Sequence, residues 1–145
     1  MAEKVKFFKS EPFENSDARR EIRGVAGELG IHLEIAQIKL IQFNQTSVNN
    51  RLVVGNHKHL GDSDQWEFII IIGSREKQLI DFRYRNDGEL IKKKILFGGD
   101  IVAIPPGCCL GLIPLDASAK IIEISNKTYD SKNYAFEDLF SENQK

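Results

Sequence analysis

Residues 99–107 read Gly-Asp-Ile-Val-Ala-Ile-Pro-Pro-Gly and contain one short apolar run with a chain reversal at each end. Residues 101–104 are apolar and mostly β-branched or small, which suits a pleated, half-buried surface. The prolines cannot continue a strand ladder, and the flanking glycines allow the positive φ angles that tight turns require. This stretch therefore predicts a β-strand over residues 101–104 that begins and ends at a turn.

The same succession of short apolar runs and turn signals continues through most of the chain. Asn86-Asp87-Gly88 predicts a tight hairpin turn. Residues 31–43 shift the phase of their apolar alternation, which predicts two strands or one bulged strand, and residues 44–50 predict a polar loop. Eighteen isoleucines against eight alanines also favour strands over helices. The other predicted strands cover residues 65–72, 78–84, 90–97, 110–115 and 120–125.

The two ends of the chain carry weaker signals. Residues 17–30 mix charges with glycines and predict a turn-rich lead-in, and His32 is expected to face solvent. The tail, residues 134–145, has room for a short helix over residues 136–140. Because short strands recur at roughly 8 to 12 residues, the whole pattern predicts an all-β sandwich or small barrel.

Composition excludes several classes of protein. The 145 residues are 41% apolar and 28% charged with a net charge of −1, and a chain of about 150 residues can bury a core without disulfides. We expect one domain over residues 1–145. No long basic stripe is present, so nucleic acid and anionic lipid are not expected partners. No apolar run approaches the roughly 20 residues of a membrane span, and the first residues lack a signal-peptide core.

The two cysteines, Cys108 and Cys109, are adjacent, which excludes a stabilising disulfide framework and fits a reduced cytosol. We therefore expect a cytoplasmic protein. A small buried side chain is the commoner role for such a free cysteine, and a thiol that faces a cavity is the alternative.

Two of the three histidines lie two residues apart. In a strand, His57 and His59 would project from the same face while Lys58 points away. Two imidazoles that share one space can bind a metal or divide the roles of acid and base, because the histidine pKa lies near neutrality. Two exposed loop histidines are the alternative interpretation of the same spacing.

These histidines and residues 99–107 together resemble the two motifs of the cupin superfamily. The first motif is a glycine, His-x-His, a glutamate and a glycine; residues 55–59 read Gly-Asn-His-Lys-His, with Gly73 at the far end. The second is a glycine that leads to Pro-x-Gly-x-x-His, and residues 99–107 match it up to the last glycine. The motifs span residues 55–110. The resemblance implies a double-stranded β-helix, also called a jelly roll or cupin barrel.

Within the cupins, the Gly-Asn-His-x-His form is similar to the RmlC-like enzymes of sugar nucleotides. These are the dTDP-4-keto-6-deoxyhexose 3,4-ketoisomerases and the cupin domains of capsular polysaccharide synthesis proteins. The ketoisomerases move protons on a keto sugar with the histidine pair and no metal, and members form dimers by exchanging strands. The resemblance implies a homodimeric isomerase or epimerase with His57 and His59 as the acid/base pair. The arginine that usually precedes Gly-Asn in this group is replaced by Val54.

Other side chains near the motifs are candidates for the same site. Tyr84 would donate or accept a proton, as a tyrosine does in related sugar epimerases. Arginine side chains suit a diphosphate, and an aromatic wall is common in sugar sites. The substrate-binding candidates are Arg51, Asn56, Trp66, Arg83 and Arg85.

A bound metal is not favoured. The expected second-motif histidine falls on Leu110, which cannot coordinate an ion. Five residues separate Glu67 from Gly73, whereas the family spacing of six selects Trp66, so Glu67 would face the other side of its strand unless a bulge corrects the phase. Stable binding of a first-row metal needs three or more ligands. If a metal binds, its ligands are expected to be His57, His59 and Glu67.

Three hypotheses for function follow, in this order. The first is an isomerase or epimerase that transfers a proton between adjacent carbons of a sugar or nucleotide sugar. The second is a degenerate cupin that binds a small carbohydrate-like ligand or a partner without catalysis, which the replaced histidine and the displaced glutamate favour. The third is a metal-dependent cupin enzyme.

Overall fold

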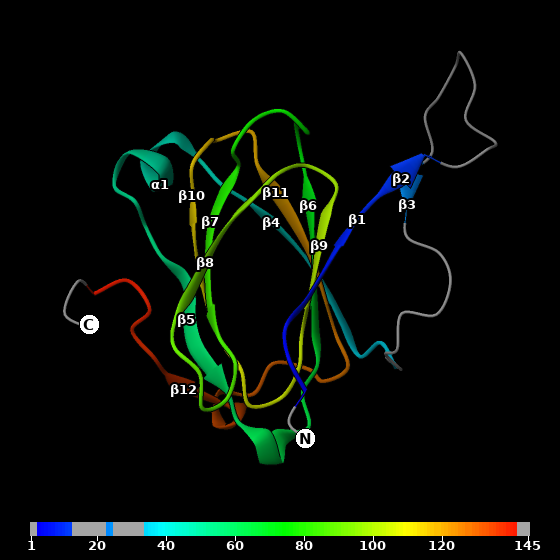
Figure 1. Cartoon of the computed structure of the whole chain (residues 1–145), viewed down its shortest axis with the longest axis vertical. Helices are drawn as coiled ribbons and strands as arrows, with labels where there is room; N and C mark the ends of the chain where they lie inside the picture. The colour runs from blue at the N-terminus through cyan, green and yellow to red at the C-terminus, as the bar shows by residue number, and fades with distance from the viewer. Residues whose placement is uncertain (1–2, 13–22, 25–33, 142–145) are drawn as a thin grey trace.

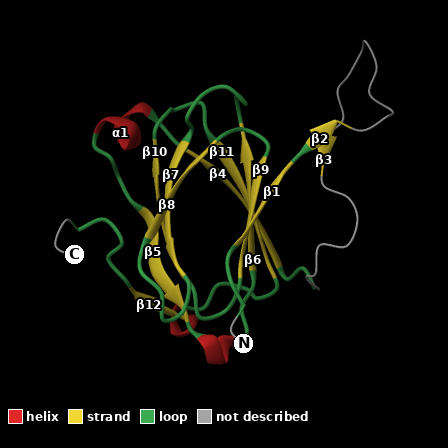
Figure 2. Cartoon of the chain, viewed as in Figure 1, coloured by secondary structure: helices red, strands yellow, loops and turns green. Residues whose placement is uncertain are grey.

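The computed structural model describes residues 3–12, 23–24 and 34–141, and nearly all regular structure in them is β (Figures 1 and 2). The two main sheets are antiparallel and five-stranded. In spatial order, the first sheet contains β1 (Lys6–Lys9), β9 (Asp100–Ile104), β6 (Glu67–Ile72), β11 (Lys120–Ser125) and β4 (Gln37–Gln42). The second contains β12 (Tyr134–Phe136), β5 (Val54–His59), β10 (Cys109–Pro114), β7 (Ile80–Arg85) and β8 (Lys92–Leu96).

A small hairpin of β2 (Glu11–Pro12) and β3 (Arg23–Gly24) projects away from these sheets (Figure 1). The predicted lead-in over residues 17–30 lies outside the described residues except for β3, and so does His32. Two strands or one bulged strand were predicted over residues 31–43, and the described part, from residue 34, contains a single strand, β4, which begins at Gln37 and pairs with β11 without a shift of register.

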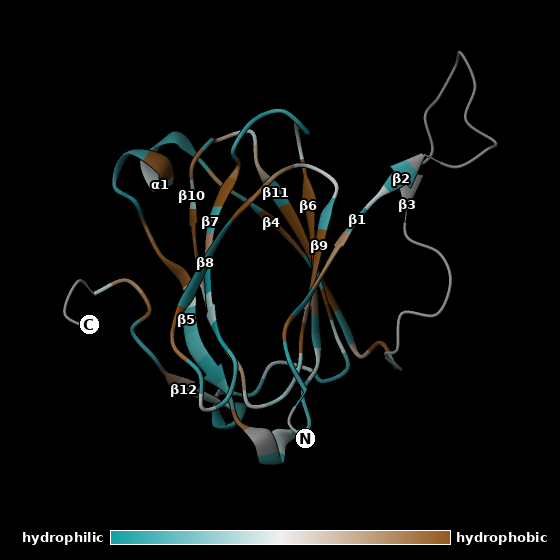
Figure 3. Ribbon diagram, in the orientation of Figure 1, coloured by the Kyte–Doolittle hydropathy of each residue, from teal (hydrophilic) through white to brown (hydrophobic). Residues whose placement is uncertain are grey.

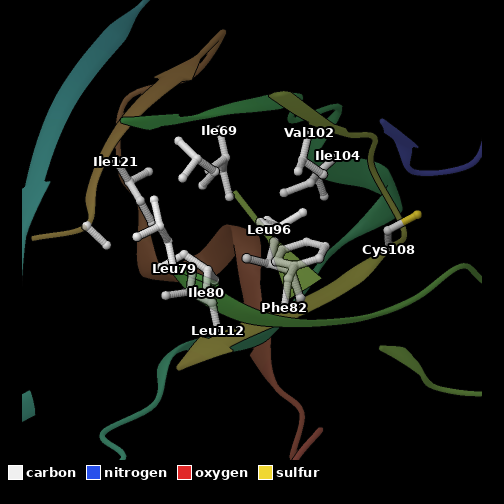
Figure 4. Close-up of a cluster of buried hydrophobic side chains, with 13 residues drawn as sticks. Ile69, Leu79, Ile80, Phe82, Leu96, Val102, Ile104, Cys108, Leu112 and Ile121 are labelled. Atoms are coloured by element: carbon white, nitrogen blue, oxygen red, sulfur yellow. The ribbon is translucent and has the colours of Figure 1, made fainter. Parts of the chain in front are cut away.

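The hydrophobic core lies between the two sheets (Figure 4). Ile69 and Val102 reach into it from the first sheet, and Phe82 and Leu112 face them from the second. Each is at most 3% exposed, and burying such a side chain stabilises a fold by about 1.5–3 kcal/mol. The ribbon is hydrophobic along most of β6 and β11, whereas the end of β5 that carries the histidines is hydrophilic (Figure 3). The predicted all-β jelly roll is confirmed.

Residues 99–107 connect the two sheets. Residues 105–107 lead from β9 of the first sheet to β10 of the second, and Gly107 has a φ of 85°, which favours glycine. The Gly107 N–H donates to the carbonyl oxygen of His59 at 2.8 Å, and the His59 N–H donates to that of Cys108 at 2.9 Å. The Pro-Pro-Gly turn therefore fixes the end of β5, where the histidine pair lies.

The predicted hairpin at residues 86–88 is confirmed, because it joins the paired strands β7 and β8. The predicted loop over residues 44–50 is wrong, because α1 (Gln45–Asn49) forms there. The Asn44 side chain accepts a hydrogen bond from the Ser47 N–H at 2.9 Å and caps this short helix. None of the helices in the described part of the chain has the length and hydropathy of a membrane span.

The short C-terminal helix predicted over residues 136–140 is also wrong. A 3-10 turn (Ser131–Asn133) leads into β12, which pairs with β5. The N–H groups of Glu137 and Leu139 then donate to the backbone oxygen and the side-chain Oδ1 of Asn56, at 3.0 and 2.8 Å. Partners on β5 thus replace the internal hydrogen bonds of a helix. We call residues 134–141 the C-terminal strap.

The outer face of the first sheet is apolar at one edge. Ile38 and Leu40 on β4 are 64% and 59% exposed, and Ile72 on β6 is 39% exposed. They belong to rows of cross-strand neighbours that run over β4, β11 and β6. In one such row Leu40 pairs with Ile122, and Ile122 pairs with Ile70. We call this surface the β4 face. Exposed apolar surface of this kind is typical of an interaction site.

Candidate active site

The histidine pair lies on the inner face of β5, as alternation along a strand predicts. The rings of His57 and His59 are stacked, with centroids 5.2 Å apart and an interplanar angle of 17°. Lys58 points away and forms an ion pair with Asp87 at 3.2 Å. His59 is fully buried. The pair therefore faces the space between the two sheets.

Acidic residues of the first sheet face these histidines. Glu67 Oε2 lies 3.2 Å from His59 Nε2, and the Glu67 side chain is 3% exposed. Next to it in the sheet, Glu123 of β11 forms an ion pair with Lys39 of β4 at 2.7 Å. The site is thus an imidazole pair on one sheet opposite two carboxylates and an ammonium group on the other.

Glu67 faces inward without a bulge in β6. Its spacing to Gly73 differs by one residue from the family pattern, and this difference is accommodated before the strand begins. A 3-10 turn (Gly61–Ser63) lies there, followed by Asp64 in the left-handed conformation at φ 55°. β6 then begins at Glu67 and continues in register with both neighbours. The prediction that Glu67 faces outward unless β6 has a bulge is therefore wrong. The turn before β6, and not a bulge within the strand, sets which of its side chains face inward.

Burial and charge set the protonation of the site. Burial, together with the neighbouring His59, lowers the pKa of His57 to about 4. Burial alone would raise the pKa of Glu67, but His59 and His57 outweigh it and hold that pKa below the ordinary value. At neutral pH the site therefore holds a neutral His57 and an ionised Glu67.

Two buried nitrogen atoms of the pair have no polar partner among the described residues, His57 Nε2 and His59 Nδ1, whereas His59 Nε2 faces Glu67. Leaving buried polar atoms unpaired is costly, by about 1–3 kcal/mol each. Such atoms fit a site that binds a polar ligand.

Tyr134 of the C-terminal strap completes the site, and sequence reasoning missed it. Its ring centroid is 4.5 Å from that of His57 and 5.5 Å from that of His59, both edge to face. The amide of Gln65 donates to its hydroxyl oxygen at 2.5 Å, and the ring of Tyr129 stacks on it at 5.5 Å. The strand pairing of β12 with β5, which brings Tyr134 here, has no short-range signal in the sequence.

The predicted Tyr84 lies elsewhere on the inner surface. Its ring contacts Phe7 and Phe82, with centroids 5.2 and 5.8 Å apart. In the register of the second sheet, Leu110 stands between Tyr84 and His57, since it pairs with both. Leu110 is 2% exposed and belongs to the core, so an apolar side chain occupies the position of the expected second-motif histidine.

The predicted arginines lie on the outer face of the second sheet. Arg85 forms an ion pair with Glu137 of the strap. Arg83 donates to the Leu139 carbonyl oxygen at 3.3 Å and stands 4.4 Å from the centre of the Phe140 ring. Arg51 is 4.0 Å from the buried carboxylate of Asp81. These side chains contact the strap or the Asp81 carboxylate, and they lie away from the histidines.

The last two candidates also have structural contacts. Asn56 anchors the strap through the two hydrogen bonds already described and adopts a left-handed φ of 60°. The Trp66 N–H donates to the side-chain Oδ1 of Asn126 at 2.8 Å, and the Asn126 N–H donates to the Trp66 carbonyl oxygen at 3.3 Å. The structure thus brings His57, His59 and Glu67 together and leaves the other candidates outside that cluster.

The donor set fits a divalent metal in part. One atom each of His57, His59 and Glu67 lies within 4.8 Å of the others. Two imidazoles and one carboxylate form a known type of metal face. The position of a further histidine ligand holds Leu110, so three ligands are present at most among these motif residues.

Known structures share the fold. No protein-family model matches the sequence, and no curated protein matches it. The sugar 3,4-ketoisomerase QdtA from Thermoanaerobacterium thermosaccharolyticum, a double mutant in complex with TDP, is 16% identical with a TM-score of 0.66 over 93% of this chain and 88% of that one. A 3,4-ketoisomerase from Helicobacter canadensis is 17% identical with a TM-score of 0.69 over 90% and 89%.

The sugar epimerase NovW from Streptomyces spheroides, described as a 4-keto-6-deoxy sugar epimerase, is 16% identical. Its TM-score is 0.70 over 93% of this chain and 69% of that chain. At these identities the likeness shows the fold. The chain therefore has the RmlC-like cupin fold that sugar-nucleotide ketoisomerases and epimerases share, and the resemblance of its motifs to the cupins is confirmed at that level.

Proposed function

We propose that this protein is an isomerase or epimerase that moves a proton between adjacent carbons of a keto sugar carried on a nucleotide. The observation that carries the proposal is the stacked, buried pair of His57 and His59 beside Glu67. Its unpaired ring nitrogens face the space between the sheets. Proteins of the same fold are named as ketoisomerases or epimerases of such sugars, and three of their structures contain TDP.

The chemistry follows from the charges of the site. A neutral His57 can take a proton from the carbon next to a ketone, where the resulting negative charge spreads onto the carbonyl oxygen. The negative charge of Glu67 lies 3.2 Å from His59 Nε2. One group that accepts a proton and one that carries a proton are what a transfer between neighbouring carbons requires.

The nucleotide part of the proposed substrate has less support than its sugar part. The arginines expected to bind its diphosphate, Arg83 and Arg85, contact the strap. The proposal for a nucleotide sugar therefore relies on the shared fold, and the proposal for proton transfer on the histidines.

Solvent exchange tests the proposal directly. We expect TDP-4-keto-6-deoxyglucose, incubated with the protein in D2O, to gain deuterium next to the ketone and to yield an isomer, both visible by NMR. His57→Ala should abolish exchange with little change in Tm, and Lys58→Ala, on the opposite face of the same strand, should behave like the parent. Exchange at the parental rate in His57→Ala would refute the acid/base role.

The same experiment separates catalysis from binding alone. A rise in Tm with TDP but no exchange of any 4-keto sugar would favour the degenerate, ligand-binding cupin.

We also propose a homodimer in the cytoplasm. The β4 face, with Ile38 and Leu40 mostly exposed, supports a second copy as its cover. Two free, buried cysteines support a reducing compartment. Sedimentation should give a dimer for the parent and a monomer for Leu40→Glu; a monomeric parent would contradict the dimer.

A further inference from the structure

The outer face of the second sheet carries a buried carboxylate with more cations than its charge requires. Asp81 of β7 is 2% exposed, and its direct neighbours in the sheet are Ile113 of β10 and Ile95 of β8. A carboxylate buried among apolar side chains is stable only when it is paired. One cation would balance the charge of Asp81, and three surround it.

The three cations come from different parts of the chain. Lys93 Nζ of β8 and Arg51 Nη2 approach Oδ2 of Asp81, at 3.4 and 4.0 Å. Arg83 Nε of β7 approaches Oδ1 at 3.5 Å. Among the residues that the structure describes, none of the three cations pairs with another carboxylate. The cluster therefore holds two positive charges in excess of its carboxylate.

The register of the sheet places two of these cations side by side. Arg83 of β7 pairs directly with Lys93 of β8, at the edge of the second sheet (Figure 1). Like charges at directly opposite positions destabilise a sheet. Asp81 offsets part of this repulsion, and an anion bound beside the two cations would offset the rest.

A hollow of about 360 Å³ lies next to this pair of cations. It is lined by Arg83, Ile91, Lys92, Lys93, Leu139 and Ser141. Lys92 forms an ion pair with Glu89 at 2.6 Å, so the excess positive charge at the hollow comes from Arg83 and Lys93. Sites for small molecules measure about 300–1,000 Å³, and the hollow has that size.

The cations suit a phosphate group in their chemistry and in their mobility. Arg83 is held in place, because Nη1 donates to the Leu139 carbonyl oxygen at 3.3 Å and the guanidinium stands 4.4 Å from the centre of the Phe140 ring. The side chains of Lys93 and Arg51 are 54% and 62% exposed, so an anion from solvent can reach them. A planar guanidinium matches two phosphate oxygens, and an ammonium group adds a point charge.

We propose that Arg83, Lys93 and Arg51 form a binding site for the phosphate or diphosphate group of a small molecule, on the outer face of the second sheet. Asp81 is its positioning residue, because it holds the three cations together. The site is separate from the histidine pair, which faces the space between the sheets. It therefore goes beyond the proposed function and does not depend on it.

Titration of 15N-labelled protein with sodium pyrophosphate, followed by NMR at an ionic strength held constant with sodium chloride, tests the site. We expect the amide signals of Arg83, Lys93 and Leu139 to shift. The affinity should fall about tenfold in Lys93→Gln and about 100-fold in Arg51→Gln/Lys93→Gln, because each change removes a charge-assisted contact. Lys58→Gln removes an equal charge from the same outer face and should bind like the parent.

A parallel titration with TDP distinguishes two sources of the phosphate group. If TDP shifts the amides at the hollow, the nucleotide is itself a ligand of this site. If only pyrophosphate shifts them, the ligand is a different phosphorylated molecule. Both results support the site.

Two results would overturn the site. The first is equal pyrophosphate affinity in the parent and in Arg51→Gln/Lys93→Gln, with an unchanged Tm to verify the fold. The second is a set of shifts confined to the amides around His57 and His59, which would place the anion in the proposed active site. The experiment measures binding alone, so its result is independent of whether the protein isomerises a keto sugar.

Discussion

Acidification should destabilise this protein through a single imidazole. The folded state holds the pKa of His57 at about 4, whereas an unfolded chain has the ordinary value of 6.5. Between these values the unfolded chain binds a proton that the folded protein does not, so stability falls as pH falls from 6.5 to 4. At pH 7 the resulting loss in the free energy of unfolding is almost absent. At pH 4.5 the loss reaches about 2–3 kcal/mol, because each pH unit between the two pKa values contributes about 1.4 kcal/mol.

The assay is denaturant unfolding of the parent and of His57→Gln at pH 7, 5.5 and 4.5. All other titratable groups are present in both proteins, so the difference between them reports the removal of the His57 imidazole and of its interactions with its neighbours. We expect the parent to lose about 2 kcal/mol more than the variant between pH 7 and 4.5, and about 1 kcal/mol of that by pH 5.5. Glu67, whose pKa lies below the ordinary value, costs stability only below about pH 4.5 and so outside this window.

Direct titration of the His57 ring by NMR gives an independent measurement. A midpoint near 4 is expected. A midpoint near 6.5, or equal pH dependence in parent and variant, would refute the argument that burial and His59 keep His57 neutral, and with it the assignment of His57 as a base at neutral pH.

Three further predictions concern other parts of the molecule. Leu139→Ala should lower the free energy of unfolding by about 2–4 kcal/mol, because it empties a fully buried position under the strap; denaturant melts check this, and a loss below about 1 kcal/mol would contradict it. Burial raises the pKa of the Cys108 thiol to about 11, so a thiol reagent followed by mass spectrometry should label it only on unfolding, and fast labelling at pH 7 would show an accessible thiol. Protein purified without chelators should carry well under one equivalent of metal by elemental analysis, and a full equivalent of iron, zinc, nickel or manganese would instead support the three-ligand site.

The strands from β6 to β11 were predictable because their limits are set locally. Glycine, proline and Asn-Asp-Gly turns end the strands within a residue or two of the predicted positions, and β11 matches its prediction over residues 120–125. The short helix α1 was not predictable from apolar periodicity, because none of its residues is buried. Its one local signal is the asparagine cap at Asn44.

The site was predictable in part for the same reason. Two histidines at a spacing of two share a face in any strand, and the structure confirms that geometry. The direction of Glu67 depends on how one turn absorbs one residue, and the position of Tyr134 depends on hydrogen bonds to Asn56, far away in the chain. Contacts of this range follow from the tertiary structure and not from spacing.

The strap also gives the site an order of assembly during synthesis. Every other described strand precedes β12 in the chain, so the remaining strands of both sheets are synthesised before residues 134–141. A nascent chain at that stage already contains the histidines and Glu67 and lacks the phenol beside them. The proposed site is therefore complete only with the strap, and a stop codon after residue 133 should lower stability as well, because it also removes the buried Leu139.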